Sequence, residues 1–215
     1  MGKDWRGGKN SVYTTLGASN HVAEDREEND FYATDPVAAE WLLKLEPQIN
    51  RIWENAVGEG NLAEVFKREG KLKAVSDLID RGYYPESIIT SYGKDFMQMN
   101  KVWKGDVVTN PPYGIALEWT KHCLDLLTEG HYLALFMKIT FLEGKERKKF
   151  FEEHPPIRIW VSSSRIPCAK NNKFELPKKD KNGNIKMTKV SSAACYAWFI
   201  WQKGYKGDTI VKWFN

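Results

Sequence analysis

The tetrapeptide Asn110-Pro111-Pro112-Tyr113 carries groups that could hold a planar ring bearing an amine. An exocyclic amine conjugated to a ring is a poor nucleophile because its lone pair is delocalised. Two acceptors aimed at its hydrogens, here the Asn110 side-chain oxygen and the Pro111 carbonyl, would pull the nitrogen toward sp³ geometry and free that lone pair. Pro111 has no N–H and adds no competing donor, while Tyr113 offers a flat face for stacking. The loop is therefore suited to activating an aromatic amine.

A glycine pair lies earlier in the chain, in the pattern Glu54-x-x-x-Gly58-x-Gly60. Two glycines allow the backbone to approach a ligand closely where a strand turns into a helix. The third glycine of the G-x-G-x-x-G fingerprint is missing, so a dinucleotide site is not supported. Taken alone, the pair fits a tight turn without a ligand equally well.

Acidic residues follow two further expected strands. A carboxylate at Asp77 is placed to accept hydrogen bonds from ribose hydroxyls. Asp95 could accept from the amino group of an adenine, and the neighbouring Phe96 could cover the purine face. Each has an alternative role as a helix cap or a core aromatic, but their joint occurrence at strand ends favours a nucleoside site.

These residues require a sheet whose strands end at one edge. The hydrophobic pattern predicts strands at 51–56, 72–76, 87–91, 106–109, 132–137, 157–161 and 195–201. It predicts helices at 62–68, 115–128 and 142–152, and an earlier one capped by Thr34 or Asp35 and running to Leu45. Alternating strands and helices indicate an α/β fold with a doubly wound, mostly parallel sheet. Such sheets bind ligands at the carboxyl ends of their strands.

The 215 residues predict one folded domain over 31–215 after an irregular, polar arm at 1–30. A basic excursion is expected at about 162–190, with Asn182-Gly183 as a hairpin turn. No separate target-recognition domain is expected.

Composition excludes several protein classes. No apolar run approaches the roughly 20 residues of a membrane helix, and the first six residues lack the apolar stretch of a signal peptide. Three cysteines without C-x-x-C spacing fit a reducing cytoplasm. The four histidines show no metal-ligand spacing, so no metal is expected.

Charge is concentrated in one part of the chain. Residues 138–189 hold 14 basic and 6 acidic residues, whereas the remainder holds 18 basic and 22 acidic. An anionic partner would be drawn to the basic part, although a solvated lysine-rich loop is the alternative. We expect phosphate contacts from Lys138, Arg147, Arg165 and Lys170.

The motifs resemble those of S-adenosylmethionine-dependent amino-methyltransferases, in which Asn-Pro-Pro-Tyr follows the fourth strand. The segment Tyr32-Ala33-Thr34-Asp35-Pro36 is similar to one that holds the methionine end of the cofactor in DNA adenine-N6 methyltransferases, with Asp35 inserted before the proline. The glycine pattern is similar to the cofactor loop of the same enzymes. Wider similarity to small methyltransferases of phages and prophages lies in the segments 16–21, 77–83, 140–144 and 196–201.

The resemblance implies a Rossmann-like class I methyltransferase with a C-terminal antiparallel strand. It implies methyl transfer from S-adenosylmethionine to adenine N6 in DNA, leaving S-adenosylhomocysteine, with the target base flipped or single-stranded. Asn110 and Pro111 would orient the amine, Pro112 would shape the loop and Tyr113 would stack on the base. The implied cofactor-binding residues are Tyr32, Thr34, Glu54, Gly58, Gly60, Asp77, Leu78, Asp95 and Phe96.

Alternatives stay open for the substrate. The same motif occurs in enzymes that methylate RNA adenine or the glutamine side chain of translation release factors. A protein that keeps the fold and binds nucleic acid without turnover is the rival from another class. We expect a monomer or a weak dimer.

Overall fold

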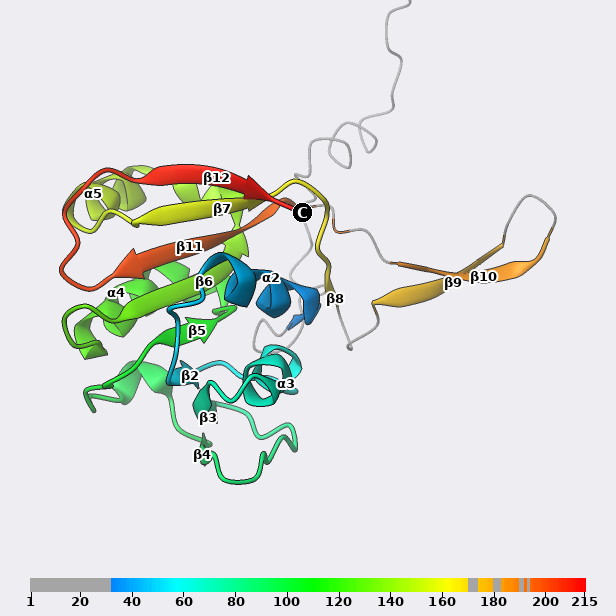
Figure 1. The fold of residues 1–215 in the computed structure, drawn as a ribbon, viewed down its shortest axis with the longest axis horizontal. Coiled ribbons are helices and arrows are strands. Elements are labelled where there is room, and N and C mark those ends of the chain that lie inside the picture. Colours follow the sequence, from blue (N-terminus) through cyan, green and yellow to red (C-terminus); the bar gives the residue numbers. More distant parts are fainter. Residues whose placement is uncertain (1–31, 170–173, 180–182, 190–191, 193) are drawn as a thin grey trace, which may run out of the picture.

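The computed structural model describes residues 32–169, 174–179, 183–189, 192 and 194–215. Its centre is an eight-stranded sheet in the order β12-β7-β11-β6-β5-β2-β3-β4 (Figure 1). These strands are β2 (Ile52–Glu54), β3 (Leu72–Asp77), β4 (Ile89–Tyr92), β5 (Val107–Thr109), β6 (Tyr132–Lys138), β7 (Arg158–Ser162), β11 (Tyr196–Gln202) and β12 (Ile210–Phe214).

Strand β11 runs antiparallel to both of its neighbours, β6 and β7, whereas the other neighbouring pairs in this sheet are parallel. The predicted α/β class and the antiparallel strand near the C-terminus are therefore confirmed. Because β11 is antiparallel, its first residue, Tyr196, lies where the neighbouring parallel strand β6 ends.

Strand β12 was not expected from the sequence. It pairs with β7 alone, at the edge of the sheet, and Ile210, Val211 and Trp213 are exposed while Phe214 is buried. An edge strand with this exposure lacks the buried alternation by which strands are recognised. Strand β2 is also shorter than the expected 51–56, because the chain leaves the sheet after Glu54 to form the glycine loop.

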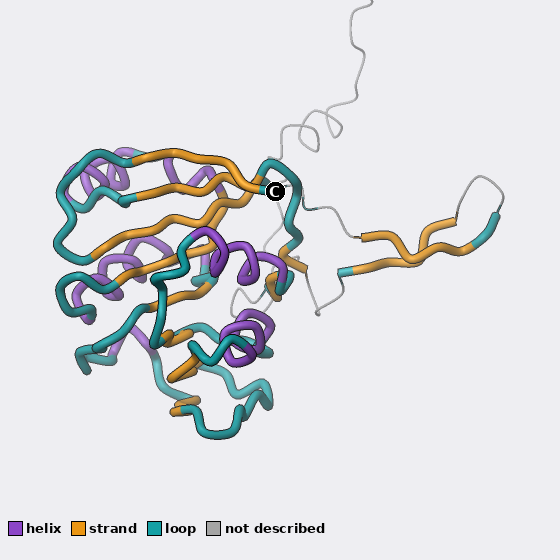
Figure 2. Tube along the Cα trace, in the orientation of Figure 1, coloured by secondary structure: helices purple, strands orange, loops and turns teal. Residues whose placement is uncertain are grey.

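Helices cover both faces of the sheet (Figures 1 and 2). Helices α2 (Val37–Leu45) and α3 (Asn61–Arg68) pack on one face, over a core that includes Trp198. Helices α4 (Ala116–Leu126) and α5 (Lys145–Glu153) cover the other, over a core that includes Phe199. Alternate residues of β11 thus serve opposite layers, as period-two strand geometry requires.

The start of α2 separates the two predicted caps. The N-cap of α2 is Pro36, so neither predicted cap holds that position, and Asp35 Oδ1 instead accepts from the N–H of the first helical residue, Val37, at 2.9 Å. Thr34 instead belongs to strand β1 (Ala33–Thr34), which pairs antiparallel with β8 (Cys168–Ala169). This short pairing places the Tyr32–Pro36 segment beside Cys168 and Ala169, more than 130 residues later in the chain.

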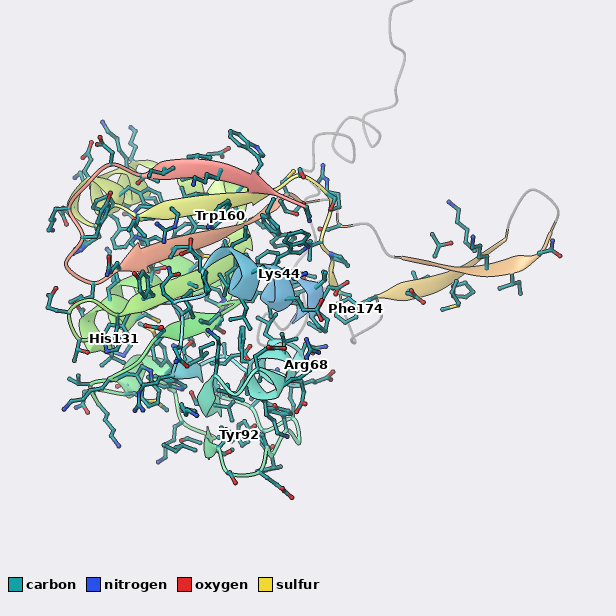
Figure 3. The ribbon with its side chains drawn as sticks, in the orientation of Figure 1. Lys44, Arg68, Tyr92, His131, Trp160 and Phe174 are labelled. Atoms are coloured by element: carbon teal, nitrogen blue, oxygen red, sulfur yellow. The ribbon has the colours of Figure 1, made fainter. Side chains whose placement is uncertain are left out.

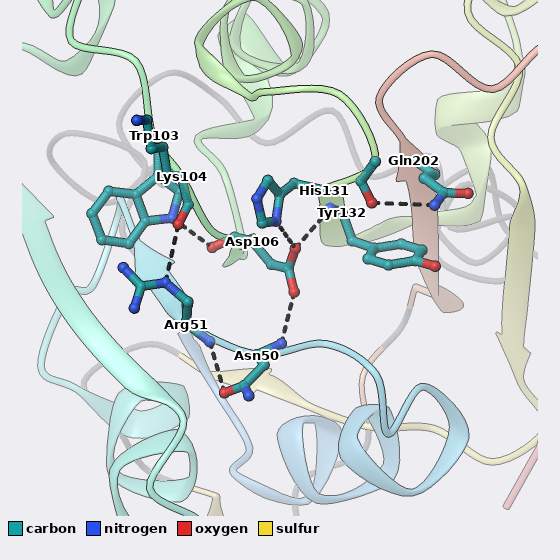
Figure 4. Close-up of polar contacts among 9 residues, drawn as sticks. Asn50, Arg51, Trp103, Lys104, Asp106, His131, Tyr132 and Gln202 are labelled. Carbon is teal, nitrogen blue, oxygen red and sulfur yellow. Dashed lines mark hydrogen bonds and ion pairs between the residues drawn. The ribbon is translucent and has the colours of Figure 1, made fainter.

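A buried carboxylate lies at the amino ends of the central parallel strands, away from the end at which a ligand site is expected. Asp106 precedes β5, is 3% exposed, and accepts from the backbone N–H groups of Asn50 at 2.7 Å and Tyr132 at 2.8 Å. His131 Nδ1 lies 3.3 Å from the same carboxylate (Figure 4). The network joins the amino ends of β5 and β6, so it sets their register without entering the site.

The predicted basic excursion contains a two-stranded ribbon, β9 (Glu175–Lys179) and β10 (Ile185–Lys189), which extends away from the body (Figures 1 and 2). Residue 182 of the expected Asn-Gly turn and the predicted arm at 1–30 fall outside the described residues. The described helices include none with the length and apolar character to span a membrane.

Candidate active site

A cavity of about 310 Å³ opens where the parallel strands end. Its walls include the loops after β2, β3 and β5 and the segment that begins at Tyr32. The sequence-predicted residues that line it are Tyr32, Thr34, Glu54, Asp77, Leu78, Asp95, Phe96, Asn110, Pro111, Pro112 and Tyr113. The structure therefore places the expected cofactor residues other than Gly58 and Gly60 in one cavity with the Asn-Pro-Pro-Tyr loop.

Gly58 and Gly60 build the loop rather than form the wall of the cavity. Gly60 has φ +87° at the start of α3, and a Cβ there would lie 2.4 Å from the Tyr83 ring. The Gly58 N–H donates to Asp77 Oδ2 at 2.8 Å. The glycines thus allow β2 to turn into α3 while the loop stays tied to the end of β3.

Asp77 is held by several donors at the end of β3. Besides Gly58, it accepts from the Ile79 N–H at 3.0 Å and from Arg81 at 3.2 Å. Arg81 and Asp77 form a mostly buried ion pair, and both line the cavity. The carboxylate orientation is therefore fixed before any ligand arrives.

Two buried acceptors of cavity-lining residues at the end of β2 lack a hydrogen-bond partner among the described residues: Glu54 Oε2 and Asn55 Oδ1. Glu54 is 2% exposed, and its pKa is raised well above its ordinary value by burial and, secondarily, by the charge of Asp77. The Asn55 amide nitrogen donates to Cys123 Sγ at 3.3 Å, whereas the amide oxygen has no partner among the described residues. Buried polar atoms of this kind carry a cost unless a ligand satisfies them.

Asp95 takes its alternative role as a helix cap, whereas Phe96 serves both as a core aromatic and as part of the cavity wall. The Asp95 carboxylate accepts from the Met97 N–H at 2.9 Å and is exposed, so the alternative role as a cap is realised. Phe96 is buried, with ring centroids 4.4 Å from Trp119 and 5.6 Å from Trp53, yet it also lines the cavity. This part of the wall is a rigid aromatic surface.

The Asn110 amide has a defined orientation. Its Nδ2 donates to Thr34 Oγ1 at 2.8 Å and lies 3.9 Å from Cys168 Sγ. Its Oδ1 is buried and has no hydrogen-bond partner among the described residues. Thr34, which was expected to hold the cofactor, here occupies the amide donor and leaves the acceptor for something else.

Tyr113 is surrounded by aromatic and basic side chains. Its hydroxyl donates to the Tyr196 hydroxyl at 3.3 Å, and its ring centroid lies 6.2 Å from that of Tyr32. The Lys138 ammonium lies 4.7 Å from the same ring, a cation–π contact. Burial raises the pKa of Tyr113, so the hydroxyl is neutral at physiological pH.

Three of the four basic residues expected to bind phosphates lie in the described part of the chain. Lys138 ends β6 beside the site, whereas Arg147 lies in α5 and contacts the Phe141 ring. Arg165 is in the loop between β7 and β8, and Lys170 lies outside the described residues. Phosphate binding by these residues stays a prediction.

Sequence reasoning missed several residues at the site: Asn55, Arg81, Trp119, Cys168 and Tyr196. Asn55 directly follows a strand, so the strand-end rule that selected Asp77 could have found it. Tyr196 begins β11 opposite Lys138, at the end of β6. An antiparallel strand begins where its parallel neighbours end, and the sequence pattern carries no signal of that reversal.

Among the described residues, no group of three or more His, Cys, Asp or Glu side chains is placed to hold a metal ion. The described part of the site is built from carboxylates, amides, hydroxyls and aromatic rings.

No family model and no curated protein matches the chain. Solved structures do match. An S-adenosylmethionine-dependent O-methyltransferase from Thermotoga maritima aligns with TM-score 0.53 and 15% identity over 83% of this chain and 69% of its own.

Two matches come from restriction systems. The type IIG restriction endonuclease BpuSI aligns with TM-score 0.54 and 15% identity over 90% of this chain, which spans 27% of that enzyme. A chain of a type I restriction–modification system aligns with TM-score 0.56 and 13% identity over 96% of this chain and 48% of its own. The chain has the Rossmann-like fold of class I methyltransferases.

Proposed function

We propose that this protein transfers a methyl group from S-adenosylmethionine to the exocyclic N6 amino group of adenine in DNA. One observation carries the proposal: the Asn110 amide, held by Thr34, keeps an unpaired buried oxygen beside Tyr113, in the same cavity as the carboxylates at the ends of β2 and β3. That arrangement offers an acceptor for an amine next to a site for a charged nucleoside.

The cavity suits S-adenosylmethionine. The unpaired oxygens of Glu54 and Asn55 are acceptors for an ammonium group, Asp77 retains lone-pair capacity for ribose hydroxyls, and Phe96 and Leu78 offer apolar surface to a purine. When bound, the cofactor supplies a methyl group on a positively charged sulfur. Ionised Glu54 would lie close to that positive charge and to the ammonium group.

The protein's own residues prepare the amine. Asn110 Oδ1 and the Pro111 carbonyl would accept from the two hydrogens of the target amine, while Tyr113 stacks on the ring. The nitrogen lone pair would then form the N–C bond as the C–S bond of the bound donor broke, leaving a neutral thioether, and the nitrogen would release a proton to solvent. This scheme requires no covalent enzyme intermediate.

Two observations favour DNA as the substrate. Residues 138–189 have a net charge of +8, which attracts a polyanion. Two solved structures that align with 90% or more of this chain belong to restriction systems, although their identity to it is 15% or lower. A phage or prophage origin and a cytoplasmic location belong to the same proposal and rest on the sequence resemblance.

Asn110→Ala tests the assigned roles. The account predicts loss of turnover by at least 100-fold, because the amine loses an acceptor used in the transition state, with a cofactor Kd within about twofold of the wild type. Isothermal titration with S-adenosylhomocysteine measures the second quantity. Parallel loss of turnover and cofactor affinity in a variant with an unchanged Tm would contradict the proposed division of the cavity.

A further inference from the structure

The ribbon formed by β9 and β10 contains a set of exposed side chains for which the described fold offers no cover. Its five registered pairs run from Ile185↔Lys179 to Lys189↔Glu175. Ile185 is 70% exposed, Met187 54% and Leu176 50%. Figure 3 shows the ribbon side chains extending into open space beyond Phe174, away from the sheet and its helices. The apolar residues of the ribbon therefore have a purpose other than the core.

A two-stranded hairpin that packs on nothing is marginally stable in water. The register adds to this cost, because Lys186 lies directly opposite Lys178 and both side chains are exposed. Like charges directly opposite each other destabilise a strand pair. An anion that neutralises the two lysines would remove the repulsion and stabilise the ribbon.

The two faces of the ribbon differ. Residues directly opposite in an antiparallel pair point to the same face, so Ile185, Met187 and Pro177 share one face by register, with Lys179 opposite Ile185. Lys178 and Lys186 share the other face with Thr188 and Leu176. Over residues 170–189 the sequence has seven basic and two acidic residues. The ribbon thus groups Ile185 and Met187 on one face and Lys178 and Lys186 on the other, and it carries a net positive charge.

These features fit duplex DNA. The major groove of B-DNA admits a two-stranded ribbon, and its floor carries thymine methyl groups that apolar side chains contact. Five residues of strand span about 17 Å, the rise of about five base pairs. The major groove of A-form RNA is too narrow for side chains to read. Neither β9 nor β10 contains an aromatic residue of the kind on which single-stranded bases stack.

The ribbon also follows directly on the site in the chain. Strand β8 precedes it, and Cys168 of β8 lies 3.9 Å from the Asn110 amide. Figure 1 shows the ribbon extending from the side of the body on which β8 lies. A duplex held by the ribbon would therefore lie beside the Asn-Pro-Pro-Tyr loop.

We propose that the β9–β10 ribbon enters the major groove of duplex DNA, with Ile185 and Met187 against base edges and Lys178 and Lys186 reaching the flanking phosphates. The proposal rests on the proposed function in that it assigns the recognition element of the same substrate.

The test is fluorescence anisotropy on the full-length protein with a labelled DNA duplex, the matching single strand and the matching RNA duplex. We expect Lys178→Ala/Lys186→Ala to weaken duplex binding at least tenfold and to reduce the slope of log K against log salt by about 1.8, since each phosphate contact contributes about 0.9. Ile185→Thr/Met187→Thr should weaken duplex binding at least fivefold with little change in that slope. A matched control, Ile210→Thr/Val211→Thr on the exposed edge strand β12, should leave binding unchanged.

Several results would overturn the proposal: unchanged duplex affinity in both ribbon variants, equal losses on duplex and single strand, or a change of oligomeric state as the sole effect. Methylation measured on the same duplex separates this proposal from the proposed function. Ribbon-dependent binding without N6-methyladenine would contradict the proposed function alone. Wild-type methylation of the duplex by both ribbon variants would contradict the ribbon assignment alone.

Discussion

Thr34 Oγ1 accepts a hydrogen bond from Asn110 Nδ2 at 2.8 Å, and this contact decides which end of the Asn110 amide is available at the site. Thr34 is 3% exposed and lies in β1, which pairs with β8, whereas Asn110 follows β5. Segments 76 residues apart thereby determine the direction of one side chain. Thr34 is a positioning residue for the proposed reaction.

Replacing the hydroxyl tests that role. Thr34→Val keeps the shape but leaves Asn110 Nδ2 only the long contact with Cys168 Sγ at 3.9 Å, and a poorly satisfied buried amide costs about 1–3 kcal/mol. We expect kcat to fall roughly 5- to 150-fold while the Kd for S-adenosylhomocysteine changes less than twofold. Thr34→Ser, which keeps the acceptor, should recover most of the turnover. Equal turnover in the valine and serine variants would remove Thr34 from the account.

Glu54 links the site to stability. Because burial raises its pKa above 4.5 in the folded protein, the folded state binds this proton more readily than the unfolded state. The resulting stability is present below about pH 4.5 and is lost as the pH rises through the folded pKa. Glu54→Gln should therefore raise Tm relative to the wild type at pH 8 and have little effect at pH 4.5.

The same substitution should weaken binding of S-adenosylhomocysteine, because an amide interacts less favourably than a carboxylate with an ammonium group. Differential scanning calorimetry across pH and titration calorimetry at pH 8 measure the two effects. A Tm difference that does not change between pH 4.5 and 8 would show that Glu54 does not titrate as its burial requires.

Gly60 tests the construction of the loop. Gly60→Ala places a methyl 2.4 Å from the Tyr83 ring in a backbone with φ +87°. Gly130→Ala is the matched control, since φ is +82° there and nothing lies within 4 Å of the added Cβ. Both should lose about 1 kcal/mol from backbone strain, and Gly60→Ala should lose a further 1–3 kcal/mol from overpacking.

Urea denaturation measures these losses. Replacing the Tyr83 ring with a smaller side chain, in Gly60→Ala/Tyr83→Leu, should recover part of the additional loss in the free energy of unfolding. Equal destabilisation by the two alanine substitutions would show that the Tyr83 ring can move away from the added methyl group without a loss of stability.

Substitutions at Lys138 test whether this residue contacts phosphate or has only a structural role. Its ammonium lies over the ring of Tyr113, which lines the cavity. Lys138→Met should raise the KM for duplex DNA several-fold and reduce the salt slope by about 0.9, whereas Lys138→Arg should keep both near wild type. Methylation kinetics at four salt concentrations test this. An unchanged salt slope in the methionine variant would leave Lys138 only its contact with Tyr113.

Local sequence patterns were sufficient to predict the strands of the central sheet except β12, and sequence motifs together with the resemblance predicted half of the residues that line the cavity. Asp77 and Asn110 each follow an apolar strand, and parallel strands end at one edge, so their proximity follows from the fold class. The contact between Thr34 and Asn110 could not be predicted in the same way. It depends on the pairing of Ala33 with Ala169, which no local pattern encodes.

Tyr196 shows a second limit. Its position beside Tyr113 depends on β11 running antiparallel between β6 and β7, and that reversal was expected only from the resemblance. The contact between Asp77 and Arg81 is local, four residues apart, but a basic residue at that spacing also fits a solvated loop. Residues that act through one another are thus harder to predict than residues at strand ends.

The most direct test is a methyl-transfer assay with S-adenosylmethionine labelled in its methyl group. Purified protein is incubated in parallel with duplex DNA, single-stranded DNA, ribosomal RNA and a protein extract, and the nucleic acids are digested to nucleosides. The account predicts label in N6-methyladenine from duplex DNA, and none when Asn110→Ala replaces the wild type. Label only in RNA or protein, or no label despite measurable cofactor binding, would contradict it.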